Sequence, residues 1–343
     1  GRNNGGFLNL ARIVDFALND GRDRLTGEQL GLHTGDPRNF TCIEDVMEAV
    51  KTQLLYFIKL LATEDHIIDV VQSELTPHVL VSTMIPGCIE KGKDITAGGA
   101  IYHTTTPFGA GLATATDSLA AIKKAVFEDK SVSMDELLHA LDTDFEGMEG
   151  EKIRQKLLAT PKFGNDDDYV DEFARFLTDT FMKEVETYES GRGGHLVGGF
   201  FTLSSTVPLG HETPATPNGR KARTPISDSV SPTNGVEENG PTAVLNSAAK
   251  IDHSRCAAGN AVNIKFSPGA LESAGKLEKF ANLITAYLID MHGFEVQINV
   301  VSADTLRAAQ KNPAEYRDLI IRIAGYSARF VELAPDIQED LIT

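Results

Sequence analysis

The chain has 343 residues, and 49 acidic against 32 basic side chains give it a formal net charge of −17. Hydrophobic residues make up 41% of the chain, a proportion that predicts a globular core and excludes a disordered or collagen-like protein. The acidity argues against a nucleic-acid partner, because a phosphate backbone selects a basic surface. No apolar run approaches the roughly 18 residues of a membrane-spanning helix, so no membrane association is expected.

Isolated cysteines and the start of the chain indicate a reducing, intracellular protein. Cys42, Cys88 and Cys256 form no CxxC pair, which excludes a zinc ribbon and an iron–sulfur ligand set. The opening segment GRNNGGFLNL shows no charged stretch followed by an apolar one, so no signal peptide is expected. The chain begins in a Gly/Asn-rich stretch and not with Met, which suggests a fragment or a processed chain.

In the first part of the chain, apolar spacing and capping residues predict helices. One helix is predicted over residues 8–19. Thr41 and Glu44 have the spacing of a capping box, and the helix they start is expected to run to about Ser73. Two short apolar segments, 78–84 and 100–106, are predicted to be buried strands.

Two more helix signals follow, and the second contains an acidic run. Residues 117–128 predict an amphipathic helix, and Ser133 with Glu136 forms a second capping box. The acidic run 165–168 precedes a helix that extends to about Glu189. These carboxylates suggest a metal site, but carboxylates at a helix N-terminus also complement the helix dipole, and we favour that structural interpretation.

The second part of the chain mixes strands with helices. A glycine-rich strand is predicted over 194–206, and residues 217–250 are rich in Pro, Ser, Asn and Gly, which marks the best domain boundary. Beyond it we expect elements at 276–290 (helix), 294–301 (strand), 303–311 (helix) and 319–324 (apolar run). Interleaved helices and short strands predict the α/β class.

One predicted strand alternates with a period of two. Apolar side chains at 294, 296, 298 and 300 alternate with Glu295, Gln297 and Asn299. The polar face is interpreted as solvated or hydrogen-bonded to the framework and not as catalytic. His253 and His292 are likewise expected to be structural histidines.

The informative segment lies near the C-terminus. By pattern alone, Gly325 after an apolar run is a bend. However, RIAGYSARFVEL at 322–333, followed by PDIQEDLI, resembles the radical-bearing loop of the glycyl radical enzymes, the superfamily of pyruvate formate-lyase and the radical diol dehydratases. Further similar segments occur in the family's order: TPNGRKA (216–222), NGPTAVLNSAAKIDH (239–253), NIKFSPGAL (263–271), VQINVV (296–301) and AQKNPAEYRDLIIR (309–322). Upstream, four segments resemble the family's dehydratase/lyase branch and extend the resemblance over essentially the whole chain: LNDGRDRLTGEQLGLHTGDPRNF (18–40), EKGKDITAGG (90–99), DSLAAIKKAVF (117–127) and PKFGNDDDYVDE (161–172).

The resemblance implies a fold and a chemistry. It implies part of a ten-stranded α/β barrel of the pyruvate formate-lyase type over residues 1–216 and a C-terminal glycyl radical domain over 217–343. Gly325 would store a radical that passes to a cysteine thiol, and the resulting thiyl would abstract hydrogen from a small substrate. A separate S-adenosylmethionine/iron–sulfur activating enzyme would install the radical, with no permanently bound cofactor. The family is homodimeric, and oxygen sensitivity places it in an anaerobic cytoplasm.

The resemblance is less direct about which cysteine forms the thiyl radical. The string GCIE at Cys88 is similar to the family's thiyl loop, but CIEKGKD followed by a glycine pair matches a second string of the dehydratase branch. Cys88 is therefore expected to be a buried packing residue. The true thiyl loop and its glutamate would lie immediately upstream of Gly1, so the chain alone would be an incomplete catalyst. The alternative is a non-catalytic split subunit that lends its radical to another chain.

Two positions give information about the class of substrate. Asn4 and Phe201 occupy places where diol dehydratases of the family carry an Asp and a Tyr, and both are candidate substrate-binding residues. Loss of the carboxylate and the phenol argues against a plain glycerol or propanediol dehydratase. Cleavage of a C–O, C–N, C–S or C–C bond in a small substrate stays open.

Overall fold

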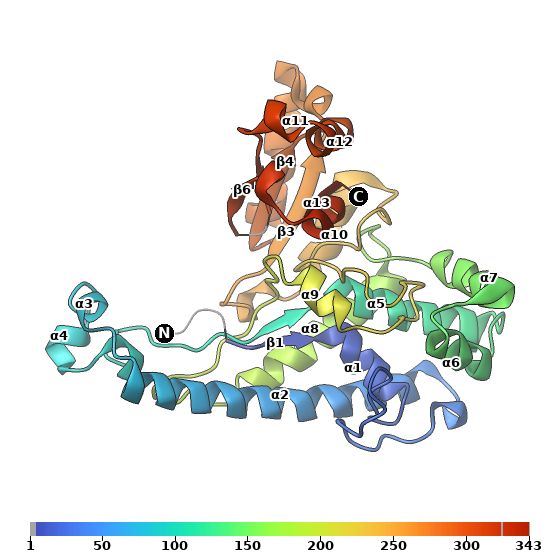
Figure 1. Ribbon diagram of the computed structural model, residues 1–343, viewed down its shortest axis with the longest axis horizontal. Helices are drawn as coiled ribbons and strands as arrows, with labels where there is room; N and C mark the ends of the chain where they lie inside the picture. Colours follow the sequence, from blue (N-terminus) through green and yellow to red (C-terminus); the bar gives the residue numbers. More distant parts are fainter. Residues whose placement is uncertain (1–4, 324, 343) are drawn as a thin grey trace.

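The computed structural model describes residues 5–323 and 325–342 as a mixed α/β chain (Figure 1). The helices are α1 (Leu10–Ala17), α2 (Ile43–Leu75), α3 (Val79–Ser82), α4 (Cys88–Lys91), α5 (Leu112–Ala121), α6 (Met134–Asp142), α7 (Gly147–Leu158), α8 (Asp168–Val185), α9 (Thr206–His211), α10 (Gly240–Ala249), α11 (Ala274–Thr285), α12 (Ala303–Lys311) and α13 (Pro335–Ile342). The strands are β1 (Phe7–Asn9), β2 (Phe108–Ala110), β3 (Ala261–Phe266), β4 (Glu295–Val300), β5 (Ile320–Arg322) and β6 (Ser327–Arg329). None of the helices described is long and apolar enough to cross a membrane.

The larger part of the molecule is a helical layer around two short parallel strands. Helix α5 is buried along its whole length, and α1 and α8 pack against it. Its alanine, serine and threonine side chains are small, so neighbouring helices can approach closely. Strands β1 and β2 pair in parallel, with Phe7 opposite Phe108. Figure 1 shows the long helix α2 beneath this layer, with α3 and α4 beyond its far end.

The C-terminal elements form a second unit that stands above this layer in Figure 1. Strands β3 and β4 pair in parallel from Ala261↔Glu295 to Phe266↔Val300. Strands β5 and β6 form an antiparallel hairpin. A separate small core joins α12, the hairpin and α13, and its buried side chains are Leu306, Ala309, Ile321, Phe330 and Ile342.

Several predicted helix starts and one strand agree with the structure. Strand β4 and helix α12 lie where the sequence predicted them, and Ser133 and Glu136 form the expected capping box. The predicted box at Thr41 and Glu44 is wrong by one residue. Residue 42 is the N-cap of α2, and the Asp45 carboxylate accepts the backbone N–H groups of Thr41 and Cys42.

The predicted strands at 78–84, 100–106 and 194–206 are wrong. The first contains helix α3, and the other two contribute only isolated pairs such as Thr105↔Leu196 and Phe200↔Asn260. Short apolar runs of this length fit a strand and a buried turn equally well, because they are too short to show a hydrophobic period that would distinguish the two.

The acidic run at the start of α8 has the structural role that we favoured. Asp167 accepts the backbone N–H of Tyr169, and the Lys250 ammonium pairs with Asp166, Asp168 and Asp171. Within residues 5–323 and 325–342, no group of histidine, cysteine and acidic side chains has the arrangement of a metal site.

Because the small C-terminal core is separate, shortening one of its side chains should destabilise that unit alone. Phe330 is fully buried, so Phe330→Ala should lower the free energy of unfolding of this unit by about 3–5 kcal/mol. Hydrogen exchange should accelerate in α12, β5 and α13 but not in α5. Equal acceleration in α5 would show that the two cores unfold together.

Candidate functional site

Gly325 lies at the tip of the β5–β6 hairpin. The backbone N–H of Ile323 donates to the carbonyl oxygen of Tyr326 at 2.9 Å, which closes the turn. Gly325 has φ +76°, in the left-handed region that side-chain-bearing residues rarely adopt. It is solvent-exposed in this chain. The tip thus presents a backbone Cα that has no Cβ and is exposed on one side.

One face of Gly325 packs against Phe201. A Cβ built on the glycine would lie 2.7 Å from Cε1 of Phe201 and 3.2 Å from Cδ2 of Leu203, so a side chain would collide with them. The Phe201 ring in turn lies 6.4 Å from the ring of Phe108, which stacks on Phe7 at 5.8 Å. A row of aromatic rings therefore connects strands β1 and β2 with the glycine.

The polar face of β4 holds the other side of the hairpin. The Oε1 atom of Gln297 accepts the backbone N–H of Gly325 at 2.9 Å and the Nε–H of Arg322 at 3.0 Å. Its Nε2 donates to Oε1 of Glu295 at 2.7 Å. Asn299 pairs with Arg322 in both directions: its Nδ2 donates to the Arg322 carbonyl at 2.6 Å, and its Oδ1 accepts the Arg322 N–H at 2.8 Å. Of the two interpretations of this strand face, solvated or hydrogen-bonded to the framework, the structure shows the second.

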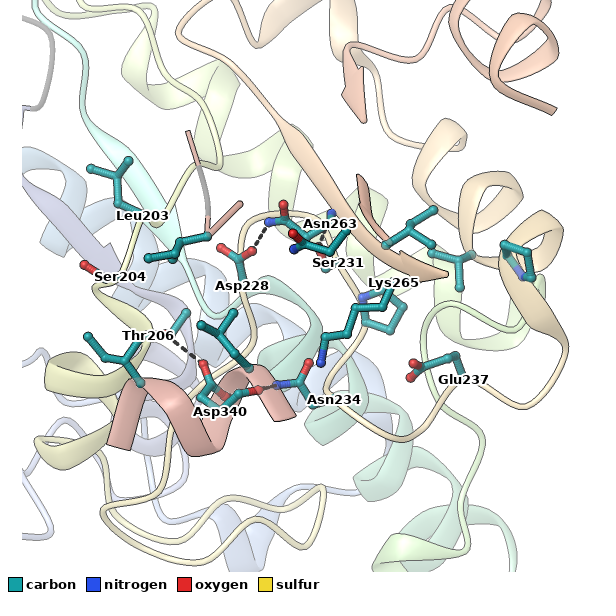
Figure 2. Close-up of a pocket in the computed structure, with 18 of the residues that line it drawn as sticks. Leu203, Ser204, Thr206, Asp228, Ser231, Asn234, Glu237, Asn263, Lys265 and Asp340 are labelled. Atoms are coloured by element: carbon teal, nitrogen blue, oxygen red, sulfur yellow. Dashed lines mark hydrogen bonds between the residues drawn. The ribbon is translucent and has the colours of Figure 1, made fainter. Parts of the chain in front are cut away.

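A cavity of about 220 Å³ with a mixed polar and apolar lining lies behind the hairpin, between the two units (Figure 2). It is bounded by β3, the hairpin, α13 and the loop segments after Leu203 and Asp228. The Asp228 carboxylate accepts hydrogen bonds from Thr202, Asn263 and Ser229. The Asp340 carboxylate of α13 accepts from Thr206 at 3.3 Å and from Asn234 at 3.0 Å.

The cavity disfavours charge. Burial raises the pKa of Asp228. Burial, reinforced by the negative charge of Asp228, raises the pKa of Asp340 to about 6. Burial lowers the pKa of the Lys265 ammonium, which Figure 2 shows pointing into the cavity toward Asn234. No local sequence signal pointed to this pair of carboxyls, because they come from a loop and the last helix.

The remaining candidates fall into three groups. Asn4 lies outside the described residues. Cys88 is buried, 3% exposed, as predicted, and its helix α4 lies at the left end of the lower layer in Figure 1, well away from β6 in the upper unit. His253 is a structural histidine, with Nε2 2.9 Å from the Ala248 carbonyl and Nδ1 3.1 Å from Asn260. His292 is an exposed residue in the loop before β4.

One of the segments that resemble the glycyl radical enzymes, TPNGRKA, contains an arginine with a structural role. The buried Arg220 guanidinium donates to the carbonyl oxygens of Gly210, Pro214 and Thr224, and so ties the loop after α9 together. Burial lowers the pKa of Arg220 to about 10. This arginine therefore organises backbone and is not free to bind a ligand.

Comparison with known proteins identifies the family. A model described as pyruvate formate lyase-like matches residues 1–210, and a glycine radical model matches residues 226–331. The chain belongs to the pyruvate formate lyase-like family and carries its glycine radical segment.

Individual relatives resemble this chain along nearly all of it. It is 40% identical to trans-4-hydroxy-L-proline dehydratase of Clostridioides difficile over 98% of this chain and 42% of that protein. It is also 40% identical to isethionate sulfite-lyase of Desulfovibrio desulfuricans, over 98% of this chain and 41% of that protein. The chain thus spans about two fifths of the length of these relatives.

Solved structures confirm the fold prediction. The glycerol-bound B12-independent glycerol dehydratase from Clostridium butyricum superposes with a TM-score of 0.94 at 42% identity, covering 98% of this chain and 42% of that one. Hydroxyproline dehydratase from Clostridioides difficile gives a TM-score of 0.92 at 40% identity, with the same coverage. The chain is α/β and forms part of a barrel of the pyruvate formate-lyase type with a glycyl radical domain.

The cavity predicts a pH dependence of stability. Because the folded-state pKa of Asp340 lies above its unfolded value of about 3.9, the stabilisation is fully present below about pH 4 and is lost as the pH rises through about 6. The loss should not exceed about 3 kcal/mol. Asp340→Asn, a neutral isostere, should be less sensitive than wild type over this range in thermal unfolding. Identical pH profiles would contradict the assignment.

Proposed function

We propose that this chain is part of a glycyl radical lyase or dehydratase and that Gly325 stores the radical. The observation that carries the proposal is the exposed Gly325 at a hairpin tip, inside the segment that matches the glycine radical model. A radical on this Cα is flanked by an amide nitrogen and a carbonyl, and both delocalise it. A side chain there would crowd the planar centre and its approach to a sulfur atom.

The hydrogen-abstracting cysteine is proposed to lie outside this chain. Support comes from the three cysteines that are present: Cys88 lies far from the hairpin, and Cys256 is buried, with its pKa raised to about 11 by burial. Cys42 sits at the start of α2, in the other unit of the structure. The division at residue 217 into a barrel part and a glycyl radical domain remains our proposal.

The reaction is proposed to cleave a C–O, C–N, C–S or C–C bond of a small substrate. The named relatives include dehydratases of trans-4-hydroxy-L-proline and (2S)-3-sulfopropanediol and a sulfite-lyase of isethionate. Asn4 and Phe201 are proposed substrate-side residues. The Phe201 ring beside Gly325 supports this role, because it forms an apolar wall without hydrogen-bonding capacity next to the radical carbon.

The radical requires a source and protection. We propose that a separate S-adenosylmethionine/iron–sulfur enzyme abstracts the hydrogen from Gly325, and that the protein works as a homodimer in an anaerobic cytoplasm. The alternative is a split subunit that lends its radical to another chain. A cysteine loop encoded in frame before Gly1 would favour the single enzyme, whereas a start codon there would favour the split subunit.

The radical position can be tested by spectroscopy. After anaerobic activation of the complete gene product, an electron paramagnetic resonance doublet should appear in wild type and be absent in Gly325→Ala. Exposure of activated wild type to air should release a C-terminal piece that begins at about Tyr326, seen by mass spectrometry. A doublet that survives in Gly325→Ala would place the radical elsewhere.

The cysteine assignment makes a separate prediction. Cys88→Ala in the complete gene product should retain turnover, with about 1–3 kcal/mol of stability lost because Cys88 is buried. Replacement of the proposed upstream cysteine should abolish turnover while the Gly325 radical still forms. Loss of turnover in Cys88→Ala, in a folded protein with an intact radical, would bring the thiyl loop inside this chain.

A further inference from the structure

We propose that Gln297 is the positioning residue of the radical, because its side-chain oxygen fixes the amide of Gly325. This inference rests on the proposed storage of the radical at Gly325. The bond joins Oε1 of Gln297 to the backbone nitrogen of Gly325 at 2.9 Å. That nitrogen is bonded directly to the radical carbon, so the contact acts on the group that delocalises the unpaired electron.

The orientation of the Gln297 amide is dictated by its neighbours. Two donors, the N–H of Gly325 and the Nε–H of Arg322, meet one end of the side chain. A carboxylate of Glu295, which only accepts, meets the other end at 2.7 Å. Only one amide orientation satisfies all three contacts, so the oxygen must face Gly325.

The platform beneath Gln297 is rigid and dry. Gln297 is 5% exposed, so water cannot easily replace its oxygen as the acceptor. It sits in the middle of β4, which pairs with β3 along six residues, and Gln297 is opposite Asn263. One pleat further along the same face, Asn299 holds both backbone groups of Arg322. The hairpin is thus held to β4 at two successive positions.

The chemical consequence concerns the radical itself. In the proposed transfer, the S–H bond of a cysteine breaks, a C–H bond forms at Gly325, and the unpaired electron moves from carbon to sulfur without net charge. The radical carbon is stabilised most when the nitrogen, Cα and carbonyl carbon of Gly325 share a plane with their substituents. Gly325 has φ +76° in its C–H form, so the residue must turn toward planarity when the radical forms. An acceptor on the N–H keeps the amide anchored during that change and increases electron donation from nitrogen into the planar radical, so Gln297 lowers the energy of the stored state.

The test compares three variants of the activated complete gene product. Gln297→Leu removes the acceptor. Glu295→Gln is the matched control, because its amide oxygen can still accept from Gln297. The exchange variant Gln297→Glu with Glu295→Gln restores the pair with its polarity reversed, so that a carboxylate oxygen faces Gly325. Each is measured by the α-hydrogen hyperfine splitting of the radical doublet and by the anaerobic half-life of the signal.

The expected outcomes differ between variants. Gln297→Leu should alter the splitting and shorten the half-life about tenfold, the factor that one net hydrogen bond supplies. The control and the exchange variant should retain a long half-life. A folded Gln297→Leu protein with the splitting and half-life of wild type would overturn the proposal. Absence of any doublet in wild type, or its survival in Gly325→Ala, would instead reject the radical position.

A second measurement covers a Gln297→Leu variant that does not fold. After exchange into D2O, electron–nuclear double resonance reports the quadrupole coupling of the Gly325 amide deuteron, which falls as its hydrogen bond strengthens. A carboxylate accepts more strongly than an amide. The coupling should therefore be smaller in the exchange variant than in wild type. An equal coupling would show that residue 297 does not bind the Gly325 amide.

Discussion

The position of the hairpin depends on side-chain amides that take the place of a backbone ladder. Strands β3 and β4 form a two-stranded sheet, and β5 pairs only with β6 among the strands described. The link from β4 to β5 is made by Asn299, which bonds both backbone groups of Arg322, and by Gln297, which bonds Gly325. A backbone ladder would tolerate many side chains, whereas this link uses side-chain acceptors at two alternate positions, here the carboxamides of Gln297 and Asn299. The glycine tip is therefore specified by β4 and not only by its own turn.

Two independent constraints require a glycine at position 325: the backbone conformation and the space around the Cα. Its positive φ disfavours a residue with a side chain, and Phe201 and Leu203 occupy the volume that a Cβ would need. Either constraint alone is common in turns. Together they hold the Cα between an aromatic ring on one side and an amide acceptor at its nitrogen. The bend interpretation and the radical interpretation therefore do not compete, because the bend is what exposes the carbon.

The sequence predicted an element well where a hydrophobic pattern repeated over many residues. The alternation over residues 294–301 defined β4 and its polar face, but a period of two cannot say what covers that face. The partner, Gly325, follows more than twenty residues later and is brought there by the fold. Asp228 and Asp340 had no signal at all, because their proximity arises only when α13 packs near the loop after α9. Local patterns also failed at α3, where a short apolar run forms a helix and not a strand.

The cavity behind the hairpin lies where the two hydrophobic cores meet, and it weakens the packing between them. The small core around Phe330 and the large core around α5 are separate clusters. Between them lie the partly buried carboxyls of Asp228 and Asp340, and desolvation raises the pKa of both. A boundary that encloses empty volume and partly buried polar groups contributes less dispersion and apolar burial than a filled core. Separation of the hairpin unit from the layer below should therefore require less free energy than unfolding either core, and its displacement would uncover the face of Gly325 that Phe201 now occupies.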